Sequence, residues 1–242
     1  MNKYIIITGS SGDLGFSIAK EILNKKSYQV IAINRSYNKN IISLKKTYKK
    51  RFIFLPFDIK NFSRIEDMYN KKIKPIGQVV GLINNAAIAY DDLITNANYK
   101  KLEEMFCVNV FSPILLSKLV IRNMLLNKNH GSIVHISSIA ASTGYKGLSM
   151  YGSTKGALES FSIGLSREWG RKGIRSNCIS PGFIKTNMSK SLNQDQINKI
   201  IKRSSLKKLI TTSEVAKIAS FLISNESSSI TGTVIRSDAG SL

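Results

Sequence analysis

A tyrosine and a lysine that lie four residues apart, Tyr151 and Lys155, could together move a proton to or from a bound substrate. They open an apolar-patterned stretch that predicts a long helix over residues 151–169, and residues four apart on a helix point the same way. A phenol titrates at about pH 10 in water, so at neutral pH it is a weak acid and very little of the basic phenolate is present. An ammonium one turn away stabilises the phenolate, and the pair is therefore predicted to act as a general acid and base.

Ser138 precedes Tyr151 by thirteen residues and follows the apolar run 131–137, which predicts a buried strand. The end of a strand and the start of the next helix meet at one edge of a sheet. We therefore expect Ser138 to share a cleft with Tyr151 and Lys155.

Apolar segments with strand character alternate with helical patterns along the chain. The predicted strands are residues 4–8, 28–33, 52–55, 79–83, 133–137, 176–180 and 233–236. The predicted helices are residues 18–23, 65–73, 102–126, 151–169, 194–204 and 213–224, and Pro113 is expected to kink or divide the third of these. This alternation predicts one α/β domain over residues 1–242, with a doubly wound, seven-stranded parallel sheet and helices on both faces.

The first strand runs into a glycine-rich turn, Gly9-Ser-Ser-Gly-Asp-Leu-Gly15, and a helical pattern follows. Glycines in such a turn let backbone amides approach a pyrophosphate, which sits at the positive end of the helix dipole. A glycine-rich string alone is a weak signal, but a second strand follows at the distance of a βαβ unit. The turn therefore predicts a dinucleotide site.

The residues after the second strand, Asn34-Arg35-Ser36, bear on the choice of dinucleotide. A carboxylate there would bind the adenosine ribose of NAD, whereas the 2′-phosphate of NADP requires a cation. Arg35 can bind a phosphate through two parallel hydrogen bonds, and Asn34 and Ser36 can add others. We predict NADP(H) over NAD(H), with Lys39 as a weaker second contact. The alternative is that Arg35 is an ordinary solvated residue.

The formal charge of +21 allows two interpretations. A basic surface could attract nucleic acid, a membrane or an acidic carrier protein. Alternatively the charge is compositional, because lysine far outnumbers arginine and the cations are spread along the chain, with modest clusters at 45–51 and 199–208. No base-stacking aromatic motif accompanies them. We favour the compositional interpretation and expect neither a nucleic-acid nor a membrane partner.

Two cysteines, Cys107 and Cys178, lie in apolar segments without the spacing of metal ligands. They predict buried thiols in a reducing compartment and no metal site. Met1 leads directly into the first strand, so no signal peptide is expected, and no apolar run approaches the roughly 20 residues that span a membrane. We therefore expect a cytoplasmic protein.

A series of motifs runs through the chain in a fixed order. It consists of Thr8-Gly-Ser-Ser-Gly-Asp-Leu-Gly15, Asp58-Ile59, Asn84-Asn-Ala86, Asn109, Ser138, Tyr151-x-x-x-Lys155 and Pro181-Gly182. In this order and spacing the motifs resemble those of the short-chain dehydrogenase/reductase family, over essentially the whole chain. The resemblance implies a Rossmann fold and an oxidoreductase. The run 174–188 is most similar to the 3-oxoacyl-acyl-carrier-protein reductases, a similarity shared with sugar, polyol and steroid enzymes.

The resemblance implies a role for each of four side chains. Tyr151 would protonate the carbonyl oxygen as hydride arrives, and Lys155 would lower the pKa of the phenol and hold the nicotinamide ribose. Ser138 would hydrogen-bond the substrate oxygen, and Asn109 would hold a water that links Lys155 to solvent. The cofactor contacts implied are Gly9, Ser11, Asp13, Leu14, Gly15, Asn34, Arg35, Ser36, Asp58, Ile59, Asn85, Ala86, Tyr151, Lys155, Pro181, Gly182, Ile184 and Thr186.

Two positions depart from the family pattern. Asp13 stands where the family has its second glycine, and we expect its carboxylate to suit the helix N-terminus and point away from the pyrophosphate. Ala87 replaces the glycine of Asn-Asn-Ala-Gly and adds a methyl group beside the nicotinamide end of the cleft.

The substrate is expected under a lid at about residues 183–209, which includes Met188, Leu192, Ile197 and Ile201. The opposite wall is expected to include Ala140, Thr143, Gly144, Leu148 and Met150. These side chains predict an acyl chain or a neutral ketone, and hence an NADPH-dependent 3-oxoacyl reductase. The alternatives are a dehydrogenase or reductase of a sugar, polyol or cell-surface glycan intermediate, and a non-catalytic NADPH-binding protein.

Two kinds of protein partner are expected. Lys146, Arg171 and Lys172 could meet an acidic acyl carrier protein, although ordinary solvated lysines would give the same pattern. The family commonly pairs the helices that correspond to residues 102–126 and 151–169, which implies a homotetramer or a homodimer.

Overall fold

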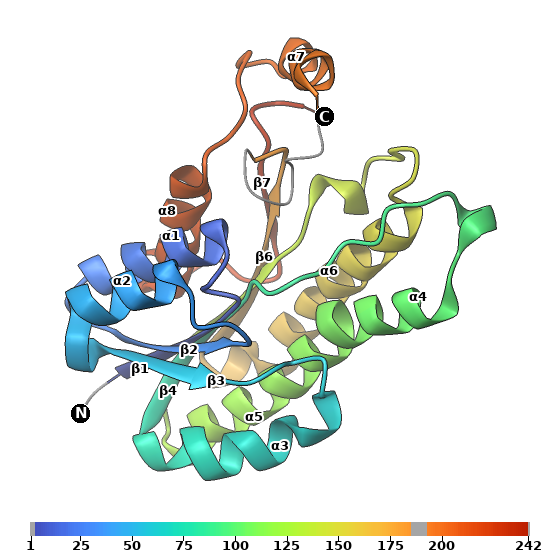
Figure 1. Ribbon diagram of the computed structural model, residues 1–242. Helices are drawn as coiled ribbons and strands as arrows, with labels where there is room; N and C mark the ends of the chain where they lie inside the picture. The colour runs from blue at the N-terminus through green and yellow to red at the C-terminus, as the bar shows by residue number, and fades with distance from the viewer. Residues whose placement is uncertain (1–2, 185–192, 242) are drawn as a thin grey trace.

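Seven apolar segments form one parallel sheet in the computed structural model, which describes residues 3–184 and 193–241 (Figure 1). The strands are β1 (Lys3–Thr8), β2 (Gln29–Asn34), β3 (Phe52–Pro56), β4 (Gln78–Asn84), β5 (Gly131–Ile136), β6 (Ile174–Pro181) and β7 (Val234–Ser237). Their order is β3-β2-β1-β4-β5-β6-β7, and every neighbouring pair runs parallel. The predicted doubly wound seven-stranded sheet is confirmed.

The winding of the chain changes direction at β1. β2 pairs on one side of it, with Thr8 opposite Ile33, and β4 pairs on the other, with Ile7 opposite Ile83. The connections therefore leave β1 and β4 toward opposite faces, and a crevice opens between them at the carboxyl ends of the strands. Ligands of doubly wound sheets bind in this crevice.

Helices cover both faces of the sheet (Figure 1). The α-helices are α1 (Asp13–Asn24), α2 (Lys39–Tyr48), α3 (Ile65–Met68), α4 (Tyr99–Phe106), α5 (Ser112–Leu126), α6 (Ser149–Trp169), α7 (Gln194–Arg203) and α8 (Thr212–Ile223). One apolar core lies under α1, α2 and α8 and contains Ile5 and Ile7, whereas the other lies under α3, α5 and α6 and contains Ile6. Because successive strand residues point to opposite faces, the isoleucine run of β1 supplies both cores.

Pro113 marks a break in the long helical stretch, as the sequence predicts. α4 passes into a π-helical segment, Cys107–Phe111, and α5 then begins with Pro113 in its first turn. Proline has no backbone N–H to donate to the preceding turn, so it is tolerated where a regular helix starts. The π-helical segment contains the buried Asn109.

The combined helix Tyr99–Leu126 is, among the described residues, the one that is long and apolar enough to cross a membrane. Of its most apolar window, 67% is buried inside the fold. It packs on β4 and contributes Leu116 and Val120 to the core, so its hydrophobicity is explained by burial against the sheet.

Of two helices outside the central motifs, α2 was not predicted and α7 was. α2 forms where no helix was predicted; the Asn38 side chain caps it by accepting from the Ile41 N–H, and Ile41 and Leu44 are its buried residues. The predicted helix near 194–204 is confirmed as α7, which has a capping box at Asn193 and no buried residue. Figure 1 shows α7 standing beyond the carboxyl ends of the strands. Thr186, Met188 and Leu192 of the expected lid lie outside the described residues.

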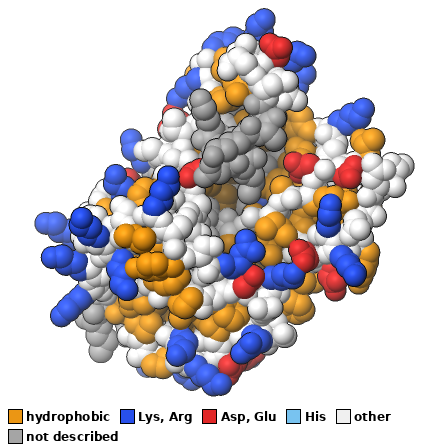
Figure 2. All heavy atoms as spheres, viewed as in Figure 1, with side chains coloured by type: hydrophobic (Ala, Val, Ile, Leu, Met, Phe, Trp, Pro, Cys, Tyr) orange, Lys and Arg blue, Asp and Glu red, His pale blue; other side chains and the backbone are white. Residues whose placement is uncertain are grey.

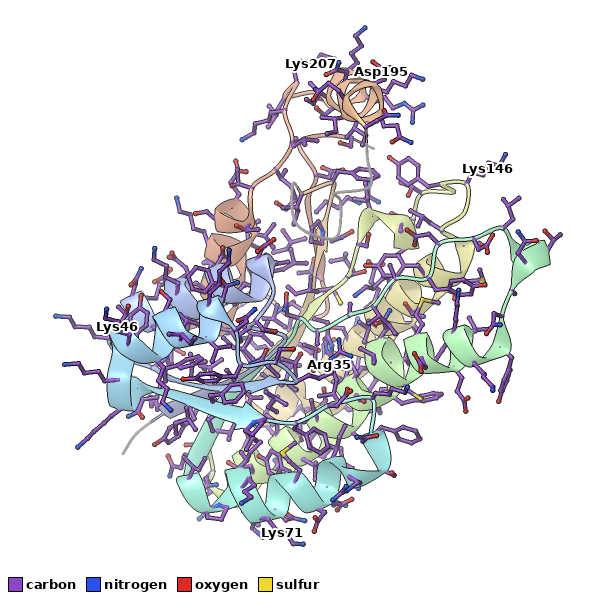
Figure 3. All side chains as sticks on the ribbon, viewed as in Figure 1. Arg35, Lys46, Lys71, Lys146, Asp195 and Lys207 are labelled. Atoms are coloured by element: carbon purple, nitrogen blue, oxygen red, sulfur yellow. The ribbon has the colours of Figure 1, made fainter. Side chains whose placement is uncertain are left out.

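Lysine and arginine side chains are spread over the surface. Figure 2 shows basic atoms around most of the visible outline, with the densest group beside α1 and α2. In Figure 3, Lys46, Lys71 and Lys146 point outward from three separate parts of the molecule. This distribution agrees with a compositional origin of the charge.

Candidate active site

A cleft of about 650 Å³ lies at the carboxyl ends of the strands, within the size range of cofactor and substrate sites. The predicted residues that line it are Gly9, Ser11, Asp13, Leu14, Gly15, Asn34, Arg35, Ser36, Asp58, Ile59, Asn85, Ala86, Ser138, Tyr151, Lys155, Pro181, Gly182 and Ile184. Asn109 is fully buried and does not line it, and Thr186 lies outside the described residues. Within the described residues, no group of three or more His, Cys, Asp or Glu could hold a metal ion.

The glycine-rich turn requires glycine at two positions. Gly9 has a φ of 76°, and a Cβ there would lie 2.9 Å from the Ala86 Cα. A Cβ at Gly15 would lie 2.3 Å from the carbonyl oxygen of Gly9. The turn therefore folds tightly against the start of α1, whose N–H groups face the cleft. Asp13 begins α1, where a carboxylate favours the helix dipole, and it borders the cleft.

Side-chain hydrogen bonds tie the turn to the end of β4. The Asn85 amide donates to the carbonyl oxygens of Thr8 at 2.9 Å and Gly9 at 3.3 Å. In return, the Thr8 hydroxyl accepts from the backbone N–H groups of Asn85 and Ala86, each at 3.0 Å. These bonds hold the two sides of the crevice at a fixed separation.

Charged side chains gather where β2 and β3 end. Arg35 lies 3.8 Å from the carboxylate of Asp58, and its side chain is 68% exposed. Lys60 and Glu104 form a second ion pair on the same side of the cleft. Exposed ion pairs contribute little to stability, so the Arg35 guanidinium can turn to another anion at small cost.

Ser138 and Tyr151 meet at the opposite end of the cleft. Ser138 follows β5 and caps a short 3₁₀ turn, Ile139–Ala141, by accepting from the Ala140 N–H at 3.2 Å. Tyr151 lies in the first turn of α6, and its hydroxyl hydrogen-bonds to that of Ser138. A Cβ at Gly152 would lie 2.4 Å from the Ala140 carbonyl oxygen, so glycine lets α6 approach the 3₁₀ turn closely enough for this contact.

Lys155 on α6 and Asn109 on the π-helical segment before α5 are both buried. The Lys155 Nζ donates to the Ile136 carbonyl at 2.8 Å and lies 5.5 Å from the centre of the Tyr151 ring. The Asn109 amide donates to the Ile88 carbonyl at 2.9 Å and to Thr154 Oγ1 at 3.0 Å, and its Oδ1 accepts from the Ile88 N–H at 3.0 Å. Asn109 therefore joins the segment after β4 to the residue beside Lys155. Its link to Lys155 through a water stays a prediction.

The protonation states of the pair differ from the expectation. Burial, with a smaller contribution from the Asp91 charge, raises the pKa of Tyr151 to about 12, although the Ser138 hydrogen bond opposes the rise. Burial also lowers the pKa of Lys155 to about 8. The expected lowering of the phenol pKa by Lys155 is therefore not found in this structure, because desolvation of the phenolate dominates. At neutral pH Tyr151 is protonated and Lys155 is mostly charged, which suits an acid that gives a proton to a substrate.

The substrate end of the cleft differs in part from the predicted wall. Ala140 and Leu148 line it, whereas Thr143, Gly144 and Met150 are not among the described residues that do. Tyr145, which no sequence motif marks, also lines this end, and its ring packs edge-on against Phe183 with 5.7 Å between ring centres. Asp91, seven residues after β4, lines the cleft as well and was not predicted to do so.

Fold and cleft together define an NAD(P)-binding oxidoreductase that acts on CH–OH or C=O groups. The family model described as enoyl-(acyl carrier protein) reductase matches residues 9–241. The chain belongs to the short-chain dehydrogenase/reductase family.

Individual relatives match almost the whole chain. The 3-oxoacyl-acyl-carrier-protein reductase FabG of Buchnera aphidicola subsp. Baizongia pistaciae is 38% identical, with 98% of this chain and 96% of that protein covered. The L-xylulose reductase of Caenorhabditis elegans is 34% identical, with 99% and 95% covered.

Solved structures of two related proteins contain nicotinamide cofactors. ElxO with NADP bound is similar with a TM-score of 0.90 and 31% identity, and the match covers 100% of this chain and 99% of that one. 4-Hydroxyisoleucine dehydrogenase complexed with NADH has a TM-score of 0.92 and 27% identity, with 99% and 98% covered.

Proposed function

We propose that the protein is an NADPH-dependent reductase of 3-oxoacyl thioesters, such as those bound to an acyl carrier protein. The observation that carries the proposal is the meeting of the Ser138 and Tyr151 hydroxyls at a largely apolar end of the cleft. Two hydroxyl donors at one point suit a ketone oxygen, and an apolar wall suits an acyl chain. The 38% identity to a 3-oxoacyl-acyl-carrier-protein reductase supports the same substrate class.

The other end of the cleft fits NADPH. The close contacts that require Gly9 and Gly15 leave backbone N–H groups accessible to a pyrophosphate at the start of α1. The amide nitrogen of Asn34 is buried at the cleft and has no hydrogen-bond partner among the described residues, so it is available to a ligand. Arg35 supplies a cation for a 2′-phosphate and favours NADPH over NADH.

Each of the four site residues has a separate role in carbonyl reduction. The nicotinamide, when bound, supplies a hydride to the carbonyl carbon. Ser138 and Tyr151 donate hydrogen bonds to the carbonyl oxygen and orient it. Tyr151 then transfers its hydroxyl proton to that oxygen, so the alcohol formed has gained one hydride and one proton. The Lys155 ammonium stabilises the phenolate, and Asn109 is proposed to hold the water through which the proton returns.

A second candidate function is the same chemistry on a sugar, polyol or glycan intermediate. The 34% identity to an L-xylulose reductase favours it. A non-catalytic NADPH-binding protein is disfavoured because Ser138, Tyr151 and Lys155 are all present and lie in one cleft.

Oxidation of NADPH by the purified protein tests these functions, with acetoacetyl coenzyme A and L-xylulose as substrates. Rapid oxidation with the thioester and little with the sugar is expected. Faster turnover of L-xylulose would favour the second function. Absence of turnover with either substrate, despite NADPH binding, would favour the non-catalytic alternative.

We further propose that an acidic acyl carrier protein delivers the substrate. Lys146 is exposed on the loop before α6, at the cleft end of that helix. Arg171 and Lys172 are exposed beyond its other end, about 30 Å away, so Lys146 is the one of the three cations that lies near the cleft. Figure 3 shows Lys146 pointing away from the body of the molecule. Complementary charge raises the rate of encounter with an acidic partner. The proposed location is the cytoplasm.

A homotetramer or homodimer is also proposed. Phe111 at the start of α5 and Ile163 on α6 are large apolar side chains that remain exposed, and the exposed Phe62 packs its ring 5.7 Å from that of Phe111. Exposed apolar side chains on neighbouring helices suit a contact between two copies of the chain. Sedimentation velocity tests this proposal, and a monomer at micromolar concentration would contradict it.

A further inference from the structure

Asp91 places a carboxylate at the substrate end of the cleft. It lies in the segment after β4 and lines the cleft together with Ser138 and Tyr151. Lys155 is the cation at this end, and the uncharged described residues that line it include Ala87, Ile88, Ala89, Ile139, Ala140, Tyr145, Leu148 and Phe183. A substrate whose carbonyl oxygen reaches Tyr151 must therefore bring its neighbouring groups close to one negative charge.

Hydrogen bonds hold the segment that carries Asp91. The Asp92 N–H donates to the Gly147 carbonyl at 3.0 Å, which joins the segment to the loop before α6. The Tyr90 hydroxyl donates to the Asn96 carbonyl at 2.8 Å and accepts from the Asn98 N–H at 3.0 Å. Because both neighbours of Asp91 are fixed in this way, its carboxylate is held at the mouth of the cleft.

Of the charged groups that line the cleft, Lys155 is the cation at the same end as Asp91, and its Nζ lies 5.5 Å from the centre of the Tyr151 ring. Arg35 pairs with Asp58 and Lys60 pairs with Glu104, both at the β2 and β3 end. In residues 3–184 and 193–241, no cation forms an ion pair with Asp91. Burial raises the pKa of the Asp91 carboxyl, and the Asp91 charge in turn raises the pKa of Tyr151. The carboxylate therefore acts electrostatically at the position of the catalytic phenol.

We propose that Asp91 determines substrate specificity, admitting ketones whose neighbouring group is uncharged and rejecting those that carry a carboxylate near the reacting carbonyl. The inference rests on the proposed function, since it assumes that the carbonyl binds at Ser138 and Tyr151. Like charges in a partly desolvated cleft repel each other, whereas a thioester, ester or amide brings no charge. Asp91 thus separates 3-oxo thioesters from free 3-oxo acids and from the carboxylates of sugar acids.

A matched pair of substrates tests this proposal. Methyl 3-oxobutanoate and 3-oxobutanoate contain the same ketone and differ in one negative charge. The wild type should show a higher kcat/KM for the ester. Asp91→Asn should lower the ester-to-acid ratio by about tenfold, the effect of one partly screened charge, and Asp91→Lys should lower it further. Asp92→Asn removes the same charge from the neighbouring residue and should change the ratio by less than about twofold.

The ratio separates a specificity role from a structural one, because damage to the cleft would lower both rates together. The inference is overturned if the ester-to-acid ratio of kcat/KM is unchanged in both Asp91→Asn and Asp91→Lys. It is also overturned if Asp92→Asn changes that ratio as much as Asp91→Asn does. In either case, turnover of the ester would still support the proposed reductase function.

A binding measurement extends the test to a protein that turns over neither substrate. In a Tyr151→Phe background, quenching of bound NADPH fluorescence reports the affinities for methyl 3-hydroxybutanoate and 3-hydroxybutanoate. The added Asp91→Asn change should strengthen binding of the acid relative to the ester by about tenfold. Equal effects on both ligands overturn the role of Asp91, whether or not the proposed function holds.

Discussion

The ammonium of Lys155 donates to the backbone carbonyl of Ile136 at 2.8 Å, and this bond fixes the lysine against the last residue of β5. An ammonium has three N–H donors, so two remain for other acceptors. The ring of Tyr151 lies 5.5 Å from the same Nζ. The distance between the Lys155 ammonium and the Tyr151 ring is therefore set by the hydrogen bond to the end of β5 as well as by the spacing of the two residues along α6.

The reduction rate should depend on pH through Lys155. Its pKa is lowered to about 8 by burial, so the ammonium is charged below about pH 8 and loses its charge above it. The Tyr151 pKa is raised to about 12, so the phenol stays protonated over the same range. We expect kcat/KM for ketone reduction to fall as the pH rises through about 8, measured from about pH 6 to about pH 10. A profile that is flat across this range would contradict the assignment, and Lys172→Ala should leave the midpoint where it is.

Gly152→Ala should separate Tyr151 from Ser138. The added Cβ would lie 2.4 Å from the Ala140 carbonyl oxygen, so the start of α6 must move away from the 3₁₀ turn. We expect a loss of about 1–3 kcal/mol in the free energy of unfolding and a fall of about 10- to 100-fold in kcat. Steady-state kinetics and urea unfolding measure the two effects.

Gly156→Ala is the control on the same helix, since a Cβ there meets nothing within 4 Å. It should retain activity and gain about 0.5–1 kcal/mol of stability from the better helix former. Similar losses in both variants would show that the close contact at Gly152 is unimportant.

Arg35→Ala should weaken NADPH binding by about 10- to 100-fold and leave NADH binding nearly unchanged, because only NADPH carries the 2′-phosphate. The guanidinium is exposed and its ion pair with Asp58 spans 3.8 Å, so its removal costs the fold little. Fluorescence titration with each cofactor measures the difference. Lys46→Ala, on α2 and pointing outward in Figure 3, removes the same charge without touching the cleft. If Arg35→Ala and Lys46→Ala had the same ratio of NADPH affinity to NADH affinity, the role of Arg35 would be refuted.

His135 should make the fold sensitive to mild acid. Burial, with a smaller contribution from Lys155, lowers its pKa from 6.5 to about 3. The unfolded chain therefore binds a proton below about pH 6.5 that the folded chain does not, and stability falls as the pH drops toward 3. The loss between pH 8 and pH 5 amounts to about 2 kcal/mol in the free energy of unfolding.

Urea unfolding at the two pH values tests this, with His135→Gln losing about 2 kcal/mol less than the wild type. His130→Gln changes the exposed histidine and should behave as the wild type does. The hypothesis fails if the wild type and His135→Gln lose the same stability.

The sequence allows much of the fold to be predicted because the strands are short apolar runs bounded by glycines and polar residues. Tyr151, Lys155 and Ser138 could be placed in one cleft because their spacing fixes them at a strand end and a helix start. The helix α2 was not predicted because it has only two buried residues, Ile41 and Leu44, among polar and lysine residues, which gives a weak helical pattern.

The position of Asp91 and the pKa of Tyr151 depend on contacts between residues far apart in the sequence, which local sequence patterns do not predict. Asp91 reaches the cleft because Asp92 hydrogen-bonds to Gly147, which lies more than fifty residues along the chain. The raised pKa of Tyr151 results chiefly from burial in the folded chain, whereas the sequence shows only the nearby lysine. Long-range contacts and desolvation arise only in the folded chain, so local sequence patterns do not predict them.

The π-helical segment Cys107–Phe111 holds one residue more per turn than an α-helix would. Deleting one residue from it would turn α4 by about 100° relative to α5, since each α-helical residue advances by that angle. Asn109 would then face away from Ile88 and Thr154, although every other side chain remained in the sequence. Four of the five residues in this segment are buried, so both its length and its side chains are constrained, and a single-residue deletion should abolish activity.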